Sequence, residues 1–172
     1  DNMYFATPKT MEWIEKLKQE SKKNGTVGCV VLDKQGNLTA GTSTGGMFKK
    51  RWGRIGDSPV IGAGTYADNN SCAVSCTGHG EYFIRHAVAF DVCARYKYLK
   101  ESVEKAADYI IHTELNTNAG NGGLIAVDKL GNIAMPYNSG GMFRGFLYKE
   151  KGSPEIKKGC GIGKKIVVVG EK

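Results

Sequence analysis

The strongest constraint on the fold is a pair of apolar segments, 95 residues apart, that end in nearly the same turn sequence. Residues 26–33 are an almost continuous apolar run followed by Lys-Gln-Gly-Asn, and residues 123–128 are followed by Lys-Leu-Gly-Asn. Such runs are typical of strands buried on both faces. Ser/Thr-Gly-Gly-Met-Phe then follows at 44–48 and at 139–143. Two copies are too few for a solenoid, so we expect two related hairpins in one or two sheets.

Helices are expected before and between these hairpins. Pro8 suits the first position of a helix over residues 8–20, which a polar linker at residues 20–25 follows. Residues 80–98 are broadly apolar, as in a helix packed on a sheet. In residues 102–115, five apolar side chains recur at helical spacing: Val103, Ala106, Ala107, Ile110 and Ile111.

The order of elements predicts a layered α+β arrangement rather than an alternation of strands and helices. Further strands are expected at residues 38–44 and 166–169. Strands that are apolar on both faces need cover on both faces. Because one helix layer covers only one side, we expect a second sheet to cover the other.

Composition excludes several classes of protein. The 172 residues fit one domain or part of a larger one, and no apolar run is long enough for a transmembrane helix. The net charge is +7, but residues 149–172, with seven Lys and three Glu, hold +4 of it. We interpret that stretch as a solvated tail and expect neither a nucleic-acid nor a membrane partner. Five cysteines without a CxxC pair and three scattered histidines match no zinc spacing, which favours free thiols and a cytoplasmic location.

Two further motifs are false leads. Residues 159–164 (GCGIGK) lack the spacing of a phosphate-binding loop and are interpreted as a glycine-rich turn. Cys72 and Cys76 are four residues apart without further ligand types around them, so we expect core thiols.

The sequence Gly25-Thr26-Val27-Gly28 offers a candidate nucleophile. A threonine at a new chain N-terminus combines a hydroxyl with its own α-amine as base, and glycine before it tolerates the strained backbone that an acyl shift requires. This chemistry needs the Gly25–Thr26 bond to be cut. The alternative is a β-branched residue that simply begins a strand.

Other polar groups follow where they can serve such a nucleophile. Hydroxyls at residues 42–44 end the partner strand of the same hairpin. Arg54 and Asp57 offer one charge of each sign, either for an α-amino acid head group or as a surface ion pair. Residues 77–81 (TGHGE) precede the helix at 80–98, where backbone N–H groups can stabilise an oxyanion or merely cap the helix.

Taken together, these segments resemble the plant-type L-asparaginases and isoaspartyl peptidases, a threonine aspartase family of N-terminal-nucleophile hydrolases. The resemblance runs from Asp1 to about Gly145, and residues 1–8 are similar to the end of the family's α-subunit. The other matching segments are 25–33 (GTVGCVVLD), 36–38 (GNL), 42–47 (TSTGGM), 53–59 (GRIGDSP), 62–67 (GAGTYA), 77–81 (TGHGE), 122–128 (GGLIAVD), 131–133 (GNI) and 141–145 (GMFRG).

The resemblance implies an αββα four-layer sandwich, of which this chain is the C-terminal part. Residues 1–25 would be the end of the α-subunit and a linker, and residues 26–172 the β-subunit. The precursor would cut itself between Gly25 and Thr26 and assemble as (αβ)2. Most of the α-subunit would precede Asp1, complete both sheets and bind any structural Na or K ion. No metal is expected in this segment, and no cofactor is expected for catalysis.

The resemblance also assigns roles to residues. Thr26 would be the nucleophile, and Thr44 would hydrogen-bond to it and tune it. Thr77 and the N–H of Gly78 would form the oxyanion hole. The substrate is implied to be L-asparagine or a β-aspartyl dipeptide, with L-aspartate released from a threonine acyl-enzyme. Its α-carboxylate would bind Arg54, and its α-ammonium would bind Asp57 and the backbone near Gly78 and Gly80.

Two alternatives stay open at this point. Phe48-Lys49-Lys50 stands where the family often has Thr-Asn-Lys, which leaves glycosylasparaginase, from the same superfamily, as a second substrate class. The other alternative is a non-enzymatic binding half-domain that uses its basic tail. In that case the Gly25–Thr26 bond would stay intact.

Overall fold

The computed structural model describes residues 7–8, 12, 25–47, 50–149, 156–161 and 167–170. The helix expected over residues 8–20 and the linker after it lie outside these ranges, apart from Pro8, Glu12 and Gly25. None of the described helices is long and apolar enough to cross a membrane.

The first hairpin is confirmed. β1 (Thr26–Leu32) pairs antiparallel with β2 (Leu38–Thr44) over seven residue pairs, from Thr26 opposite Thr44 to Leu32 opposite Leu38. The turn is held by the Asp33 carboxylate, which accepts bonds of 2.8 Å from the backbone N–H groups of Gln35 and Asn37 and from the Asn37 side chain.

The second hairpin repeats this turn atom for atom. The Asp128 carboxylate accepts from the backbone N–H groups of Leu130 and Asn132, at 2.8 and 2.9 Å, and from the Asn132 side chain at 2.8 Å. Gly36 and Gly131, with φ of 87° and 90°, occupy the left-handed position that each turn requires. The sequence repeat therefore reflects a repeated structure.

The central sheet contains β3 (Thr65–Ala67), β4 (Cys72–Gly78), β5 (Gly122–Asp128) and β6 (Ile133–Ala134), in that order and antiparallel throughout. β5 was predicted. The sequence analysis missed β4, although its first five residues are all buried. Small residues predominate in β4, which lets the neighbouring layers approach closely and removes the β-branched signal of a strand.

The helix predicted over residues 80–98 is wrong as a single element. It consists of α2 (Gly80–Arg85), α3 (Val88–Ala94) and a π-helical turn, Arg95–Leu99. The chain breaks at Ala87, which is left-handed with φ 44°. The break occurs because residues of another segment accept bonds from the N–H groups at the start of α3. The N–H groups of Ala89 and Phe90 donate to the carbonyls of Ala63 and Gly62, at 3.1 and 2.8 Å.

The helix expected over residues 102–115 is confirmed. Ser102 caps it, accepting from the N–H of Lys105 at 3.2 Å. The helix then runs through α4 (Val103–Tyr109), a π-helical segment (Ile110–Glu114) and α5 (Leu115–Thr117). Its predicted apolar positions are buried, including Val103, Ala106 and Ile110.

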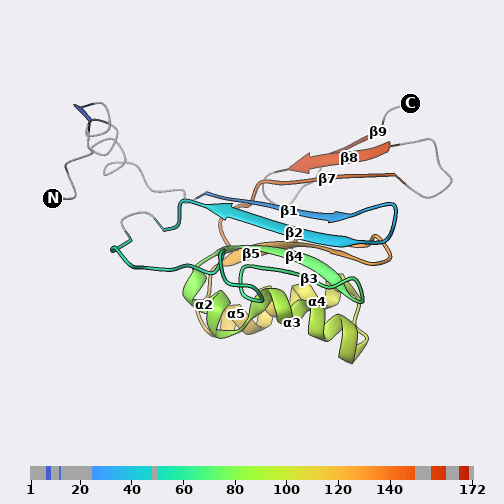
Figure 1. The fold of residues 1–172 in the computed structure, drawn as a ribbon, viewed down its shortest axis with the longest axis horizontal. Helices are drawn as coiled ribbons and strands as arrows, with labels where there is room; N and C mark the ends of the chain where they lie inside the picture. Colours follow the sequence, from blue (N-terminus) through green and yellow to red (C-terminus); the bar gives the residue numbers. More distant parts are fainter. Residues whose placement is uncertain are drawn as a thin grey trace.

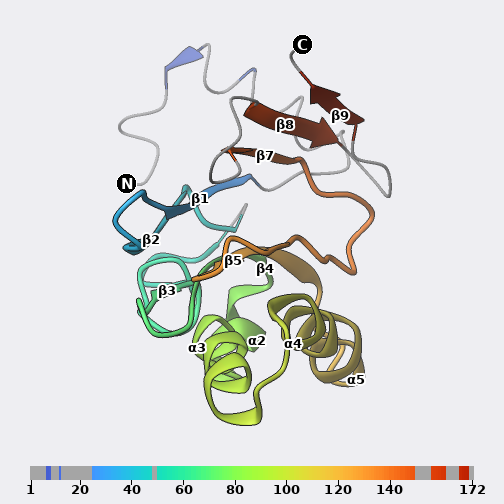
Figure 2. The ribbon, with the colours of Figure 1, turned by 90° about the vertical axis from the view of Figure 1, so that its right-hand side faces the viewer.

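The described elements form layers (Figures 1 and 2). Helices α2–α5 cover one face of the central sheet, and the β1–β2 hairpin covers the other. The main core therefore lies between helices and sheet, and a smaller core of Leu38, Ala73 and Val127 lies between the sheets. The mixed α/β class and the second sheet are as expected.

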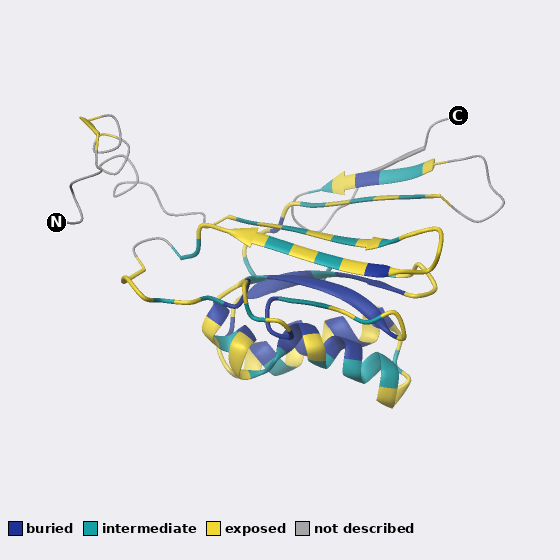
Figure 3. Ribbon diagram, in the orientation of Figure 1, coloured by how far each residue is buried: buried dark blue, intermediate teal, exposed yellow. Residues whose placement is uncertain are grey.

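The expectation that β1 is buried on both faces is wrong within the described part of the chain. Val27 and Val31 are 69% and 46% exposed, whereas the other face of the hairpin packs on the central sheet. Figure 3 shows this contrast between the alternating hairpin and the buried strands beneath it. The outward face of β1 is thus apolar and open within the described part of the chain.

The basic tail is not simply solvated. β7 (Arg144–Lys149), β8 (Ile156–Gly161) and β9 (Val167–Gly170) form a third antiparallel sheet, on the side of the hairpin away from the helices (Figures 1 and 2). The Lys157 ammonium lies 5.8 Å from the centre of the Tyr148 ring. Lysine stems can cover apolar surface in this way. Gly159–Gly161, expected in a turn, belong to β8, and residues 162–164 lie outside the described part.

Candidate active site

The candidate residues gather at one end of the layered structure. β1 begins, β2 and β4 end and α2 starts on the left side of Figure 1. The hairpin rests directly on β4 at Gly28, where a Cβ would collide with the Ser75 side chain. Ser75 Oγ also lies 2.6 Å from Thr42 Oγ1. This close packing fixes the strand ends that hold Thr26 and Thr77.

Thr26 and Thr44 are brought together by the register of the hairpin. Thr26 Oγ1 donates to Thr44 Oγ1 at 3.3 Å, and Thr44 Oγ1 donates to the Gly25 carbonyl at 3.1 Å. The N–H of Gly46 donates to Thr44 Oγ1 at 3.0 Å. The Thr44 hydroxyl thus uses its one donor and both acceptor positions. A chain of hydroxyls runs from Thr26 to the carbonyl of the bond that precedes it.

The turn after β2 is held by Lys50. Its ammonium donates to the Gly45 carbonyl, and its stem occupies the space that a Cβ at Gly46 would need. Gly46 has φ 79°, a conformation that suits glycine. Phe48 and Lys49, where the sequence departs from the family pattern, lie outside the described residues.

Arg54 and Asp57 lie close together, but they are not each other's hydrogen-bond partners. Arg54 binds Glu81 with two bonds, Nε to Oε1 at 2.8 Å and Nη2 to Oε2 at 3.1 Å. Sequence analysis noticed Glu81 only as part of the TGHGE segment and missed this contact. The Glu81 carboxylate raises the pKa of Arg54, and Arg54 lowers the pKa of Glu81.

Asp57 is a buried carboxylate whose charge is only partly compensated. The residue is 6% exposed, and its Oδ2 accepts no hydrogen bond within the described residues. Burial raises the pKa of Asp57, against the smaller lowering effects of its backbone contacts and of Arg54. Glycines enclose the carboxylate, since a Cβ at Gly64 or Gly80 would come within 2.8 Å of its oxygens. Such a group is suited to a cation that arrives from outside.

Thr77 and Gly78 end β4 beside this cluster. The backbone of Gly78 has φ 148°, and a Cβ there would collide with the Asn121 carbonyl. Only glycine therefore fits this position. Gly80 begins α2, with His79 as its N-cap residue. The Thr77 side chain is half-buried and makes no hydrogen bond within the described residues.

The structure thus forms two of the predicted groupings. Thr44 contacts both Thr26 and the carbonyl of Gly25, while Arg54 and Asp57 flank Gly80. No hydrogen bond or ion pair joins the two groupings within the described part of the chain. Among those residues, no set of three His, Cys, Asp or Glu side chains is placed to hold a metal ion.

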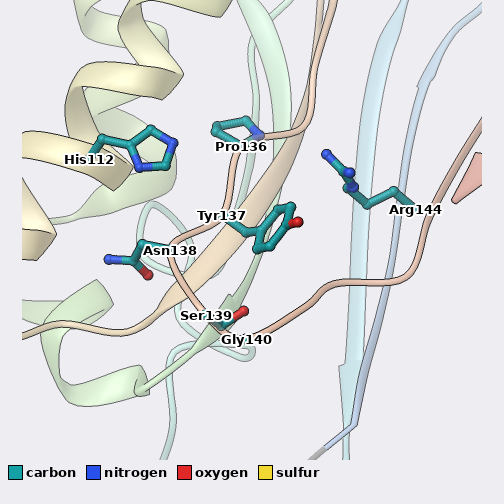
Figure 4. Close-up of a pocket in the computed structure, with 7 residues that line it drawn as sticks. All are labelled: His112, Pro136, Tyr137, Asn138, Ser139, Gly140 and Arg144. Atoms are coloured by element: carbon teal, nitrogen blue, oxygen red, sulfur yellow. The ribbon is translucent and has the colours of Figure 1, made fainter. Parts of the chain in front are cut away.

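A surface pocket of about 560 Å³ lies elsewhere and contains none of the predicted site residues (Figure 4). Asn138 fixes its wall, because its side chain bonds to the backbone of Ile111, Gly120 and Gly122 at 2.8 to 3.2 Å. The lining residues are His112, Pro136, Tyr137, Asn138, Ser139, Gly140 and Arg144.

The predicted core thiols are confirmed. Cys72 and Cys76 are buried in β4, and Cys72 Sγ lies 2.6 Å from Cys93 Sγ in α3. This contact and burial raise the pKa of Cys72, and burial raises that of Cys76. Thiols held in the neutral form are poor nucleophiles, so neither cysteine is a candidate nucleophile.

Comparison with known proteins gives a consistent result. A family model described as asparaginase matches residues 4–156. An isoaspartyl peptidase of Salmonella typhimurium is 54% identical over 129 residues, 75% of this chain and 41% of that protein. An isoaspartyl peptidase of Escherichia coli is 49% identical over 143 residues, 77% and 44% of the two chains. An isoaspartyl peptidase/L-asparaginase of Mus musculus is 44% identical over 150 residues, 80% and 44%. The chain therefore spans about two fifths of the length of these relatives.

Proposed function

This chain belongs to the asparaginase family, and we propose that it forms the nucleophile-bearing part of a self-processing amidohydrolase. Its substrates are L-asparagine and β-aspartyl dipeptides, and its product is L-aspartate. Two of the relatives are named isoaspartyl peptidase and a third isoaspartyl peptidase/L-asparaginase, which supports this substrate class. The observation that carries the proposal is the hydroxyl chain from Thr26 through Thr44 to the Gly25 carbonyl.

Self-cleavage starts from that arrangement. Thr26 Oγ1 attacks the Gly25 carbonyl carbon, the C–N bond breaks, and the hydroxyl proton passes to the departing nitrogen. The Thr44 hydroxyl, already bonded to the Gly25 oxygen at 3.1 Å, stabilises the negative charge that develops there. Water then hydrolyses the resulting ester. The products are the Gly25 carboxylate and a Thr26 with a free amine.

Substrate hydrolysis uses the amine that self-cleavage exposes. The Thr26 amine accepts the hydroxyl proton while Oγ1 attacks the side-chain carbonyl of the substrate. Thr77 and the Gly78 N–H bind the oxyanion. Ammonia or an amino acid leaves with that proton, and water releases aspartate from the ester. Arg54 binds the α-carboxylate of the substrate, and the buried Asp57 carboxylate binds its α-ammonium.

The proposal extends to the architecture of the whole protein. The open apolar face of β1, with Val27 and Val31 exposed, supports an αββα sandwich in which a further helix layer covers the hairpin. Residues 1–25 then end the α-subunit, residues 26–172 form the β-subunit, and two αβ pairs assemble. An α-subunit segment binds any structural Na or K ion. Five cysteines without a disulfide support a cytoplasmic enzyme that acts on small molecules rather than on nucleic acid or membranes.

Intact mass and N-terminal sequencing of the protein expressed from its complete gene test self-cleavage. We expect a fragment that begins Thr26-Val27-Gly28, and a single uncut chain for Thr26→Ala. A wild-type chain that stays uncut on prolonged incubation refutes the proposal and favours a binding half-domain.

Turnover then tests the substrate class. The processed protein is expected to hydrolyse a β-aspartyl dipeptide faster than an asparagine that carries N-acetylglucosamine. The reverse order would assign it to glycosylasparaginase instead.

A further inference from the structure

We propose that Glu81 is a positioning residue that holds Arg54 in place for the α-carboxylate of the substrate. This inference deepens the proposed function and rests on it, because it assigns a task to a residue beside the same site. Neither the repeat nor the spacing of Arg54 and Asp57 pointed to Glu81.

The contact has the geometry of a fixed clamp. Glu81 binds the Nε–Nη2 edge of the guanidinium with two parallel bonds, at 2.8 and 3.1 Å. A guanidinium has five N–H donors, so the Nη1 group remains for another acceptor. Two parallel bonds in one plane also fix the orientation of the guanidinium group and of its remaining N–H donors, which a single bond does not. Glu81 therefore determines which edge of Arg54 faces a ligand.

The anchor point explains why such a clamp is useful. Arg54 lies on the loop between β2 and β3, and its long side chain loses considerable rotamer freedom when it is held in one geometry. Glu81 lies in the first turn of α2, whose position is set by Phe83 in the main core. Because the helix fixes Glu81, the bonds from Arg54 to Glu81 hold the guanidinium in one orientation before any ligand binds.

The choice of partner also keeps the neighbouring carboxylate available. A Cβ at Gly80 would lie 2.7 Å from Asp57 Oδ1 and 3.2 Å from Arg54 Nη2, so the two charged groups flank the same backbone position. Arg54 nevertheless bonds to Glu81, and Asp57 Oδ2 accepts no bond within the described residues. The two ends of an α-amino acid thus meet separate partners, a positioned guanidinium and a buried carboxylate.

Three small acids distinguish the two binding groups, because each carries a different combination of α-carboxylate and α-ammonium. Aspartate has both α-groups, succinate lacks the α-ammonium, and β-alanine lacks the α-carboxylate. If Glu81 acts through Arg54, its loss weakens binding only of ligands with the carboxylate that Arg54 receives. A general distortion of the site would weaken all three.

The test compares wild type, Glu81→Gln and Glu104→Gln, each expressed from the complete gene. Glu104 is an exposed residue of α4 and provides the same chemical change away from the site. Dissociation constants of the three acids are measured by calorimetry, with weak ligands in competition against aspartate. We expect Glu81→Gln to weaken aspartate and succinate roughly tenfold, the effect of one charge-assisted hydrogen bond. β-Alanine should change by less than about twofold, and Glu104→Gln should change none of the three.

Kinetics on a β-aspartyl dipeptide add a second readout. Glu81→Gln should raise KM by the same factor as the aspartate dissociation constant and leave kcat nearly unchanged, as loss of uniform binding predicts. Equal weakening of β-alanine, unchanged binding of aspartate, or no binding by the wild type would each overturn the inference. Wild type that shows the expected binding pattern but leaves the dipeptide intact would refute the proposed function while the role of Glu81 stands.

Discussion

Replacing Asp57 by Asn should lower activity and at the same time stabilise the protein. The side chain is 6% exposed, and its Oδ2 accepts no hydrogen bond within the described residues. Burial raises the pKa of this carboxylate, which means that the fold disfavours its charged form. A neutral amide of the same shape removes this cost but cannot bind an α-ammonium as a carboxylate does.

The surroundings of Asp57 set the size of both effects. A Cβ at Gly64 or Gly80 would come within 2.8 Å of the carboxylate oxygens, so the side chain has no room to reorient and only an isosteric replacement is informative. Relief of a buried, poorly compensated charge should raise the free energy of unfolding by about 1 kcal/mol. Loss of the charged bond to the substrate ammonium, about 1.5–3 kcal/mol, should lower kcat/KM by about 10- to 150-fold.

Asp128→Asn is the matched control. Asp128 is 1% exposed, but both of its oxygens accept hydrogen bonds from the turn that follows β5. The same substitution there breaks satisfied bonds and should lower the free energy of unfolding by about 2 kcal/mol. Urea unfolding of both variants measures stability, and turnover of a β-aspartyl dipeptide measures activity.

Opposite signs of the two stability changes are the expected result. The reasoning is refuted if Asp57→Asn destabilises the protein as much as Asp128→Asn does and keeps kcat/KM within about twofold of wild type. Asp57 would then be a structural carboxylate rather than a ligand for the substrate.

Three further predictions follow from the same contacts. Thr44→Val keeps the β-branched shape but removes the hydroxyl between Thr26 and the Gly25 carbonyl, so an intact-mass time course should show self-cleavage slowed at least about tenfold; an unchanged rate would contradict this role. Gly78→Ala places a methyl group on the Asn121 carbonyl at a positive φ, and thermal unfolding should show a loss of about 3 kcal/mol or more, with native stability as the contrary result. Because burial raises the pKa of Asp57 above its ordinary value of 3.8, affinity for the α-ammonium should be lost as pH falls through that raised pKa. The KM of wild type should therefore rise at low pH, whereas the KM of Asp57→Asn should show no such rise. Identical pH profiles of KM would contradict the assignment of Asp57 to the substrate ammonium.

Local signals were sufficient for the parts of the fold that local chemistry determines. The turns at Asp33 and Asp128 were readable because each aspartate bonds to residues two and four positions later. The helix over residues 102–115 was readable from its apolar spacing. β4 and the break at Ala87 were missed because both depend on distant partners. β4 is a strand by virtue of β3 and β5, and the start of α3 is redirected by the carbonyls of the loop at residues 62–63.

The same limit applies to the candidate site. The sequence located the segments that meet there, and the hairpin register placed Thr26 opposite Thr44 as expected. It did not identify which charge pairs with which. Arg54 and Asp57 are three residues apart and were predicted to bind an amino-acid head group or to form a surface ion pair, yet Arg54 binds Glu81, which lies 27 residues further along the chain. Pairing of charges depends on where α2 packs, and sequence spacing contains no such information.

The repeat also explains why the site forms at only one of the two hairpins. Both copies have the same turn, Asp-Lys-X-Gly-Asn, where X is Gln35 or Leu130. It is followed by Thr44-Gly-Gly in one copy and by Ser139-Gly-Gly in the other. In the first copy seven residue pairs extend the ladder until Thr44 faces Thr26. In the second copy the pairing continues in the same register beyond β6, because Tyr137 pairs with Gly123 and the N–H of Asn138 donates to the Gly122 carbonyl at 2.9 Å. The residue that takes the place of Thr26 there is Asn121. Ser139 donates instead to the carbonyl of Gly141, two residues away. The turn sequence and the register are therefore common to both hairpins, whereas the residue at the start of the opposite strand, Thr26 in one and Asn121 in the other, determines whether two hydroxyls meet there.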